Sequence, residues 1–155
     1  MKLDGLTFPD DRLYAPEHKL WLREEPDGLI TLGLSAYGVA LYGDIFAFTP
    51  KRIGLRIEAD RSFGVVEFAK AAAAAKSPLA GTVSAHNPLL EQRPALIHLD
   101  PYGEGWMIRL TPEDWPAARA QLLRSDPAIS AFEREAELDG FDPDDTSVQA
   151  FRRRN

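Results

Sequence analysis

Hydrophobic and polar positions alternate over short stretches through the first 110 residues of the chain. This period of two is typical of half-buried strands, and turn-forming residues separate the stretches. Strands are therefore predicted over 18–25, 29–34, 45–50, a few residues after Gly54, from about 62, and over 82–87 and 106–110. The first two strands, joined by the turn residues 26–28, form a predicted hairpin.

Helical patterns are few and lie mainly near the C-terminus. Ser35 is a candidate N-cap for a short helix that closes near Gly43. Thr111, followed by proline and two acids, predicts the start of a longer helix. The predicted helices cover 35–44, 111–126 and 127–138, while 1–18 is irregular and 88–105 is loop with one helical turn at its start. The fold class is therefore mainly β, a compact barrel or sandwich with helices appended.

The stretch 63–83 combines two conflicting patterns around Lys70. The five alanines that follow this lysine favour a helix, because alanine has the highest helix propensity. The aromatic and β-branched residues before it, and the proline and glycine that follow the alanines at 78 and 81, favour strands. A hairpin would hold Lys70 in solvent between small neighbours, but on these grounds alone an ordinary exposed lysine is the preferred interpretation.

Composition limits the classes of function. The chain has 155 residues, 45% of them hydrophobic, and a formal net charge of -6. One domain with an appendage fits this length, and the negative charge argues against a nucleic-acid partner. Apolar runs stay well below the roughly 20 residues that cross a membrane, and acids near the N-terminus replace the apolar stretch of a secretory signal. A cytoplasmic protein is expected, with the basic residues of 151–155 as a solvated tail.

Candidate chemistry within the chain itself is sparse. There is no cysteine, which excludes thiolate nucleophiles and Cys-ligated metals. His18, His86 and His98 lack the spacing of a helical metal pair. Residues 33–38 do not have the spacing of a nucleophile elbow. Neither a catalytic site nor a metal site is predicted, so any redox or acyl chemistry requires a cofactor.

Four segments resemble, in order and spacing, the H protein of the glycine cleavage system. The segment VVEFAKAAAAAKSPLAGTV is similar to the lipoyl-attachment region of that family, and DPYGEGWMIRL is similar to its closing strand. EHKLWL resembles an early strand of the family, and GLSAYGVALYGDI resembles its short helix and the residues after it. The similarity spans about residues 14–124.

This resemblance implies a flattened β-barrel, the barrel-sandwich hybrid of lipoyl domains, with helices at the C-terminal end. It implies that lipoate is attached to Lys70 through an amide and that Glu67 takes part in recognition by the ligase. It further implies that Gly54 and Gly81 flank the attachment hairpin. A protein of this kind is a covalent carrier without an active site of its own.

The residues around Lys70 bear on which cofactor and which pathway the carrier serves. Ala69 and Ala71 stand where biotinyl carriers usually have methionines, which argues against biotin. Ala74 replaces an acid usual in glycine-cleavage H proteins, and Lys76 replaces an aromatic residue. Two bases at 51–52 replace an acidic run in the loop leading toward the hairpin. These changes are expected near the lysine, where partner enzymes dock.

The departures favour a specialised carrier, most similar to the lipoate-binding protein of the heterodisulfide-reductase-like sulfur-oxidising system. The alternatives are the glycine-cleavage H protein, which carries an aminomethyl group, and a scaffold of the same fold without lipoate. The partners implied are a lipoate ligase or lipoyltransferase, together with the reductase-like complex or with glycine decarboxylase, aminomethyltransferase and dihydrolipoyl dehydrogenase. Neither nucleic acid nor a membrane is expected as a partner. The predicted division is a carrier domain over 1–124 and a helical extension with a tail over 125–155.

Overall fold

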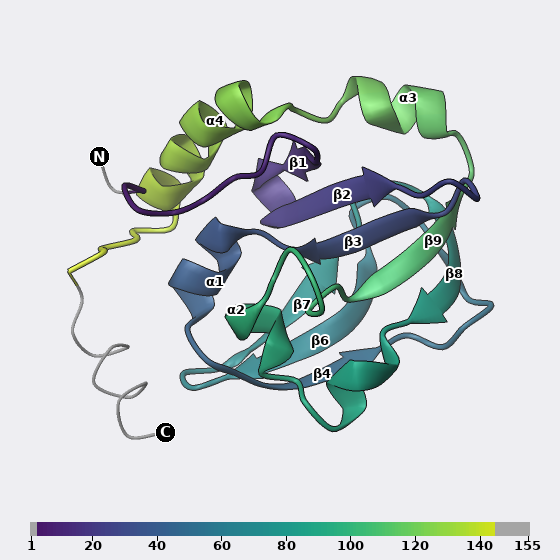
Figure 1. Cartoon of the computed structure of the whole chain (residues 1–155), viewed down its shortest axis with the longest axis horizontal. Helices are drawn as coiled ribbons and strands as arrows, with labels where there is room; N and C mark the ends of the chain where they lie inside the picture. The colour runs from purple at the N-terminus through teal and green to yellow at the C-terminus, as the bar shows by residue number, and fades with distance from the viewer. Residues whose placement is uncertain (1–2, 145–155) are drawn as a thin grey trace.

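Two antiparallel sheets form the body of the protein in the computed structural model, which describes residues 3–144 (Figure 1). The larger sheet has the strand order β1 (Leu13–Ala15), β2 (Leu20–Glu24), β3 (Ile30–Leu34), β9 (Ile108–Pro112), β8 (Gly81–His86) and β5 (Arg56–Ile57). The smaller sheet has the order β4 (Ile45–Pro50), β6 (Ser62–Phe68) and β7 (Ala72–Lys76). Since no ladder of the described residues joins the sheets, the barrel is not closed. The predicted mainly-β class and barrel-sandwich hybrid are confirmed.

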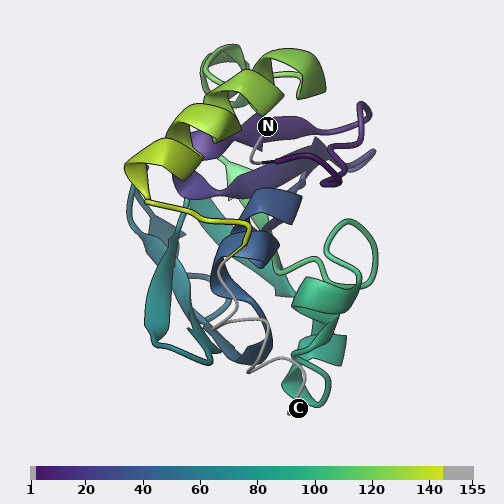
Figure 2. The same cartoon turned by 90° about the vertical axis from the view of Figure 1, so that its left-hand side faces the viewer.

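Short helices cover the edges and ends of the sheets. They are η1 (Pro16–His18), α1 (Ala36–Tyr42), η2 (Pro88–Glu91), α2 (Leu96–Leu99), α3 (Trp115–Ala120) and α4 (Ser125–Leu138). Helices α3 and α4 lie along the side of the larger sheet that carries β1 and β2 (Figures 1 and 2). The predicted cap of α1 is confirmed, because the Ser35 hydroxyl accepts a hydrogen bond from the Gly38 N–H at 3.2 Å.

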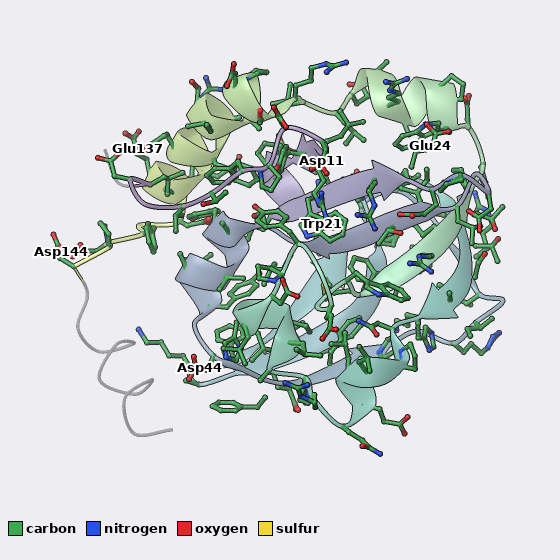
Figure 3. All side chains as sticks on the ribbon, viewed as in Figure 1. Asp11, Trp21, Glu24, Asp44, Glu137 and Asp144 are labelled. Carbon is green, nitrogen blue, oxygen red and sulfur yellow. The ribbon has the colours of Figure 1, made fainter. Side chains whose placement is uncertain are left out.

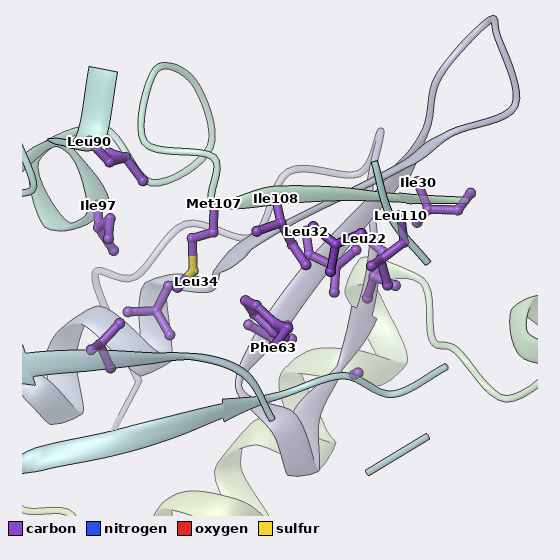
Figure 4. Packing of buried hydrophobic residues seen from close by; sticks show 14 of the residues in the cluster. Leu22, Ile30, Leu32, Leu34, Phe63, Leu90, Ile97, Met107, Ile108 and Leu110 are labelled. Atoms are coloured by element: carbon purple, nitrogen blue, oxygen red, sulfur yellow. The ribbon is translucent and has the colours of Figure 1, made fainter. Parts of the chain in front are cut away.

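The main hydrophobic core lies between the two sheets (Figure 4). Leu22, Leu32 and Leu110 extend into it from the larger sheet, and Phe63 and Val66 extend from β6 of the smaller one. The alternation of buried and exposed residues along β6 follows from this arrangement, since only one face of the smaller sheet meets the core. This packing fixes the position of β6 and of the hairpin that it begins.

A second, aromatic cluster joins α4 to the larger sheet. Phe132 of α4 is fully buried and lies 6.0 Å from the ring of Tyr14 and 5.9 Å from the ring of Tyr37. Phe8 also stacks on Phe132, with ring centroids 5.0 Å apart. Trp21 of β2 belongs to the same cluster. Helix α4 is therefore packed on the body through its aromatic face.

The predicted start of the first C-terminal helix is wrong. Thr111 and Pro112 belong to β9, where they pair with Thr82 and Gly81 of β8. Helix α3 begins only at Trp115, and the Asp114 carboxylate caps it by accepting a hydrogen bond from the Ala117 N–H at 3.2 Å. Thr111, whose local sequence resembles a helix cap, thus belongs to a strand because it pairs with β8. The residue that caps α3 is Asp114, three residues later.

Two other local predictions require correction. The N-terminal stretch predicted as irregular contains β1, which pairs with β2, and the turn η1. The loop-rich stretch 88–105 contains the expected turn η2 but also α2. Both elements are three or four residues long, too short for a periodic pattern to reveal. The basic tail at 151–155 lies outside the described residues.

Candidate functional site

The hairpin between β6 and β7 presents Lys70 at its tip. One backbone hydrogen bond closes the turn, from the Phe68 N–H to the Ala71 carbonyl at 2.9 Å. Lys70 and Ala71 are exposed, while Ala69 is half-buried. The methyl side chains on either side leave the lysine accessible, as the sequence predicts. This geometry fits a lysine that receives a long covalent group.

The alanines after Lys70 form the return strand of this hairpin. Ala72 pairs with Glu67 and Ala74 pairs with Val65, so β7 is the edge strand of the smaller sheet. Residues 72, 74 and 76 are exposed, whereas Ala73 and Ala75 pack toward the core. Pairing with β6 and burial of alternate methyl groups outweigh the helix propensity of alanine. The conflict in the local pattern is thus decided by the neighbouring strand.

Glu67 is exposed in the last part of β6, three residues before Lys70. It lies between Ala47 of β4 and Ala72 of β7 in the cross-strand pairing. Its two neighbours on this face are therefore methyl groups, and within the described residues it forms neither an ion pair nor a side-chain hydrogen bond. An exposed carboxylate therefore stands on the outer face of the sheet, three residues before the lysine.

Gly54 and Gly81 lie beyond the base of the hairpin, and neither belongs to the turn at Lys70. Gly54 has a φ of +93° and donates its N–H to the Val83 carbonyl at 2.8 Å. Gly81 begins β8, where an added Cβ would lie 2.6 Å from the Thr111 carbonyl oxygen. The first position requires glycine for its conformation and the second for the close approach of β9.

A cleft of about 360 Å³ lies beside the hairpin. Ala74 and Lys76 of β7 line one side, and Tyr42 and His18 line another. Tyr42 stacks on Phe68, with ring centroids 4.6 Å apart, and so braces the end of β6 just before the turn. Burial raises the pKa of Tyr42, and the nearby Asp139 carboxylate raises it further. Sequence reasoning missed this brace, because a helix residue and a strand residue far apart in the chain share no local pattern.

The bases at 51–52 do not lie near Lys70. The Lys51 N–H donates to the Phe63 carbonyl at 2.8 Å, at the beginning of β6, whereas Lys70 follows its end. The seven residues of β6 separate the two points by about 20 Å, at about 3.3 Å per residue. Lys76 pairs with Ser62 at the same distal end. Of the departures, Ala74 is the closest to the lysine along β7.

The three histidines take part in structural contacts. His18 Nε2 lies 2.7 Å from Asp60 Oδ1, and His86 Nε2 lies 2.6 Å from the Lys51 carbonyl. His98 Nδ1 accepts the Ile45 N–H at 2.9 Å. In residues 3–144 no group of histidines and acids could hold a metal ion, and no helix there is long and apolar enough to cross a membrane.

The chain matches a known protein family over most of its length. The family model described as glycine cleavage H-protein matches residues 12–135. This chain belongs to that family. It is 34% identical over 136 residues to glycine cleavage system H protein 5 of Aquifex aeolicus, covering 85% of this chain and 91% of that protein. It is 40% identical over 132 residues to the H protein of a Psychrobacter species, covering 85% of this chain and 98% of that protein.

A solved structure agrees with the sequence relatives. The crystal structure of a glycine cleavage system H protein from Mycobacterium marinum matches with a TM-score of 0.68 and 25% identity, over 86% of this chain and 100% of that one. H proteins are lipoyl carriers without catalytic activity of their own, and they carry lipoate covalently on a lysine. The predicted family, cofactor and carrier role are therefore confirmed. The exposed turn with its flanking methyl groups fits such a group.

Proposed function

We propose that Lys70 is the residue that carries lipoate and that the loaded side chain works as a swinging arm in a cytoplasmic carrier. The observation that supports this most directly is an exposed lysine at the tip of the β6–β7 hairpin, between two alanines. The core packing of β6 gives the arm a firm base. Tethering then raises the concentration of the carried group at a docked partner.

Each residue of the turn has a definite part in this proposal. Lys70 supplies the aliphatic stem and the amide nitrogen, and its positive charge is lost when the amide forms. Ala69 and Ala71 leave room for the ligase to reach it. Glu67 gives the ligase a carboxylate that accepts charge-assisted hydrogen bonds. The bound group supplies the redox-active dithiolane, which a chain with no cysteine lacks.

The first candidate role is transport of an aminomethyl group in glycine cleavage. The relatives from Aquifex, Psychrobacter and Mycobacterium support it, since all are glycine cleavage system H proteins. Glycine decarboxylase, aminomethyltransferase and dihydrolipoyl dehydrogenase are then the partners of the arm.

The second candidate role is transport of oxidisable sulfur for a heterodisulfide-reductase-like complex. Two features of β7 favour it. Ala74 places a methyl group, in place of a carboxylate, on the exposed face near the turn, and Lys76 adds a positive charge to the cleft beside the hairpin. Without that carboxylate the surface is less suited to a protonated amine and better suited to a neutral cargo, because Lys19 and Lys76 are balanced by Glu17 and Asp60 in the cleft.

Intact-mass spectrometry on protein from its native host tests the attachment site. We expect a mass gain of one lipoyl group, lost in Lys70→Ala and retained in Lys76→Ala, which removes another exposed lysine of the same hairpin. An unmodified Lys70 in a host whose other lipoyl proteins are loaded would support a scaffold and contradict the carrier.

The role of Glu67 is tested by the rate at which the host's lipoate ligase modifies the purified protein. Glu67→Gln should slow the initial rate roughly tenfold, because a charge-assisted hydrogen bond to the ligase becomes a weaker neutral one. The control variant Glu91→Gln changes an exposed acid on η2, and the ligase should modify it at the normal rate. Equal rates for both variants would exclude Glu67 from ligase recognition.

The two cargoes are separated by a glycine exchange assay. The lipoylated chain is supplied as the sole carrier to the host's glycine decarboxylase, and incorporation of labelled bicarbonate into glycine is measured. Incorporation that requires Lys70 supports the aminomethyl role. Its absence, together with genes for reductase-like subunits beside this one, supports the sulfur role.

A further inference from the structure

A groove of about 470 Å³ lies at the end of β4 that is farther from the lysine turn. The end of β4, the loop 51–54 and η2 form its walls, and β4 and η2 are in contact in the lower part of Figure 1. β4 starts after Asp44, which is labelled at the lower left of Figure 3, and its first residue, Ile45, pairs with Phe68 just before the turn. Pro50, at the other end of β4, lines the groove. The carrier role assigns no part to this groove.

The walls of the groove offer mainly apolar surface. Phe48 is half-buried in one wall, and Ile53 is 58% exposed at the rim. The buried polar lining residue, Asn87, already donates to two backbone carbonyls and accepts one backbone N–H. His86 Nε2 donates to the Lys51 carbonyl at 2.6 Å. An incoming group therefore finds apolar contact in the recess, where the main polar groups of the walls are engaged within the protein.

Backbone hydrogen bonds hold both walls in place before anything binds. The N–H groups of Lys51 and Gly54 each donate to a backbone carbonyl at 2.8 Å, so the loop 51–54 is anchored at both ends. On the opposite wall, Asn87 Oδ1 accepts the Leu89 N–H at 3.0 Å and caps η2. A groove that is already ordered loses little conformational entropy on binding, which favours a ligand that fits it as it stands.

Unpaired cations flank the recess on both sides. Lys51 and Arg52 stand on the loop between two lining residues, and Arg93 follows η2, where its N–H donates to the Leu89 carbonyl at 2.9 Å. These three side chains are exposed and form no ion pair within residues 3–144. The lining residues include one acid, Glu91. The groove is thus a locally positive surface on a protein whose formal net charge is -6.

This combination selects one kind of partner. Carboxylates complement the unpaired cations, and a large apolar side chain fits the recess between them. An anionic membrane or a nucleic acid would face the net charge of -6 outside this small patch, and a concave apolar surface does not insert into a bilayer. A short acidic segment of another protein meets the groove alone and avoids that repulsion.

We propose that the groove between the end of β4, the loop 51–54 and η2 docks an acidic segment of a partner protein. One large apolar side chain of the segment lies against Phe48 and Ile53, and the aspartates or glutamates beside it pair with the cations of the two walls. The bases at 51–52, which lie far from the lysine, gain a role as part of this second surface.

Docking here leaves the lysine turn uncovered. The six residues of β4 separate the groove from the turn by roughly 15–20 Å, at about 3.3 Å per residue. The inference does not rest on the attachment of lipoate, and Lys70→Ala is expected to bind the segment as the parent chain does. Failure of the carrier role would therefore leave this docking surface untouched.

Nuclear magnetic resonance on the full chain tests the proposal with synthetic peptides. The probe is a capped peptide with one phenylalanine between pairs of aspartates. We expect saturable shifts of the backbone N–H signals of Ile53 and Glu91, while that of Ala72 on the lysine hairpin stays unchanged. Replacing the phenylalanine by serine should weaken binding roughly tenfold, because the apolar contact is lost. Replacing the aspartates by lysines should abolish saturable shifts.

Surface variants locate the apolar part of the site. Ile53→Ser should weaken binding of the phenylalanine peptide roughly tenfold, because it removes apolar surface at the rim. Leu138→Ser, at a side chain on α4 that is 74% exposed, is the matched control and should leave the affinity unchanged. Both positions are exposed, so neither change is expected to disturb the fold.

Charge variants locate the electrostatic part. Lys51→Gln combined with Arg52→Gln should weaken binding roughly fivefold, the loss of two exposed ion pairs. Arg119→Gln combined with Arg124→Gln removes two exposed arginines elsewhere and should have no such effect. Added salt should weaken binding to the parent chain more than binding to the variant at 51–52.

Four results would overturn the proposal. One is equal binding of the lysine peptide, and another is a set of shifts centred on the lysine hairpin in place of the groove. The third is binding of the chain to vesicles of anionic lipid that Ile53→Ser abolishes, which would make the patch a membrane contact. The last is a dimer in sedimentation experiments that Ile53→Ser dissociates, which would mean that a second copy of the chain covers the groove.

Discussion

At the scale of single residues, the region around Lys70 depends on small side chains more than on charged ones. The turn is closed by one backbone hydrogen bond and flanked by methyl groups, and Glu67 is the nearest acid along β6. Two glycines beyond the base of the hairpin set how the strands beneath it approach one another. These positions are governed by backbone geometry, so their substitutions are predictable from it.

Gly81 and Gly54 should respond differently to an added side chain. Gly81→Ala is expected to lower the free energy of unfolding by about 1–3 kcal/mol, because its Cβ would press on the β9 backbone, and Gly81→Leu should cost more. Gly54→Ala should cost about 1–2 kcal/mol from its positive φ, and Gly54→Leu about the same, since its Cβ meets open space. Urea unfolding measures all four. A similar size dependence at both positions would contradict the distinction.

Glu25 gives the protein one acid-sensitive contact. Burial alone would raise its pKa, but hydrogen bonds from Arg23 and Thr31, each at 2.8 Å, outweigh burial and lower the pKa below the ordinary 4.5. The carboxylate therefore stabilises the fold fully above about pH 4.5, and this contribution is lost as the pH falls through the lowered pKa. Glu25→Gln should flatten this part of the stability curve, measured as urea midpoints against pH. Glu104→Gln, at an exposed acid, should leave the acid limb as steep as in the parent protein.

At the scale of elements, β7 and α3 show how strand pairing overrides local propensity. Alanine exceeds other ordinary residues in helix propensity by at most about 0.7 kcal/mol each, a preference that the ladder with β6 and the burial of Ala73 and Ala75 readily exceed. Thr111 and Pro112 likewise pair with β8 although they resemble a helix start. The strands with clear alternation, such as β3 and β4, were predicted within a residue or so.

Helix α4 should contribute to the stability of the whole body through Phe132. This side chain is fully buried among Phe8, Tyr14 and Tyr37, so Phe132→Ala is expected to lower the free energy of unfolding by about 3–5 kcal/mol. Leu138→Ala, at a side chain that is 74% exposed, should change it by less than about 0.5 kcal/mol. Tryptophan fluorescence and circular dichroism should report one common transition. An unchanged fluorescence midpoint in the Phe132 variant would mean that α4 unfolds separately, as an independent 125–155 extension predicts.

At the scale of the whole molecule, the proposed carrier is acidic and its charge depends on the state of the arm. The formal net charge is -6 with Lys70 protonated, and amide formation removes that one positive charge, giving -7. The aminomethyl and sulfur roles both require this change. The arm is therefore visible in the electrostatics of the protein as well as in its mass.

Anion-exchange chromatography should resolve the two forms. The lipoylated chain is expected to elute at higher salt than the unmodified chain, because net negative charge strengthens retention. Lys70→Ala lacks the same positive charge and should elute near the modified form without a lipoyl mass. Coelution of the modified and unmodified proteins would indicate that the added group is not on a charged amine.

The sequence by itself determined the mainly-β class, the family, the exposed lysine between alanines and the need for an external redox group. These follow from alternation, motif spacing and the absence of cysteine, all of which are local or compositional. Only the tertiary structure decided that the alanines form β7, that Thr111 is in a strand, that Lys51 lies at the far end of β6 and that Tyr42 stacks on Phe68. Each of these depends on contacts between segments distant in the chain, whose energies exceed local preferences and leave no pattern in the neighbouring residues.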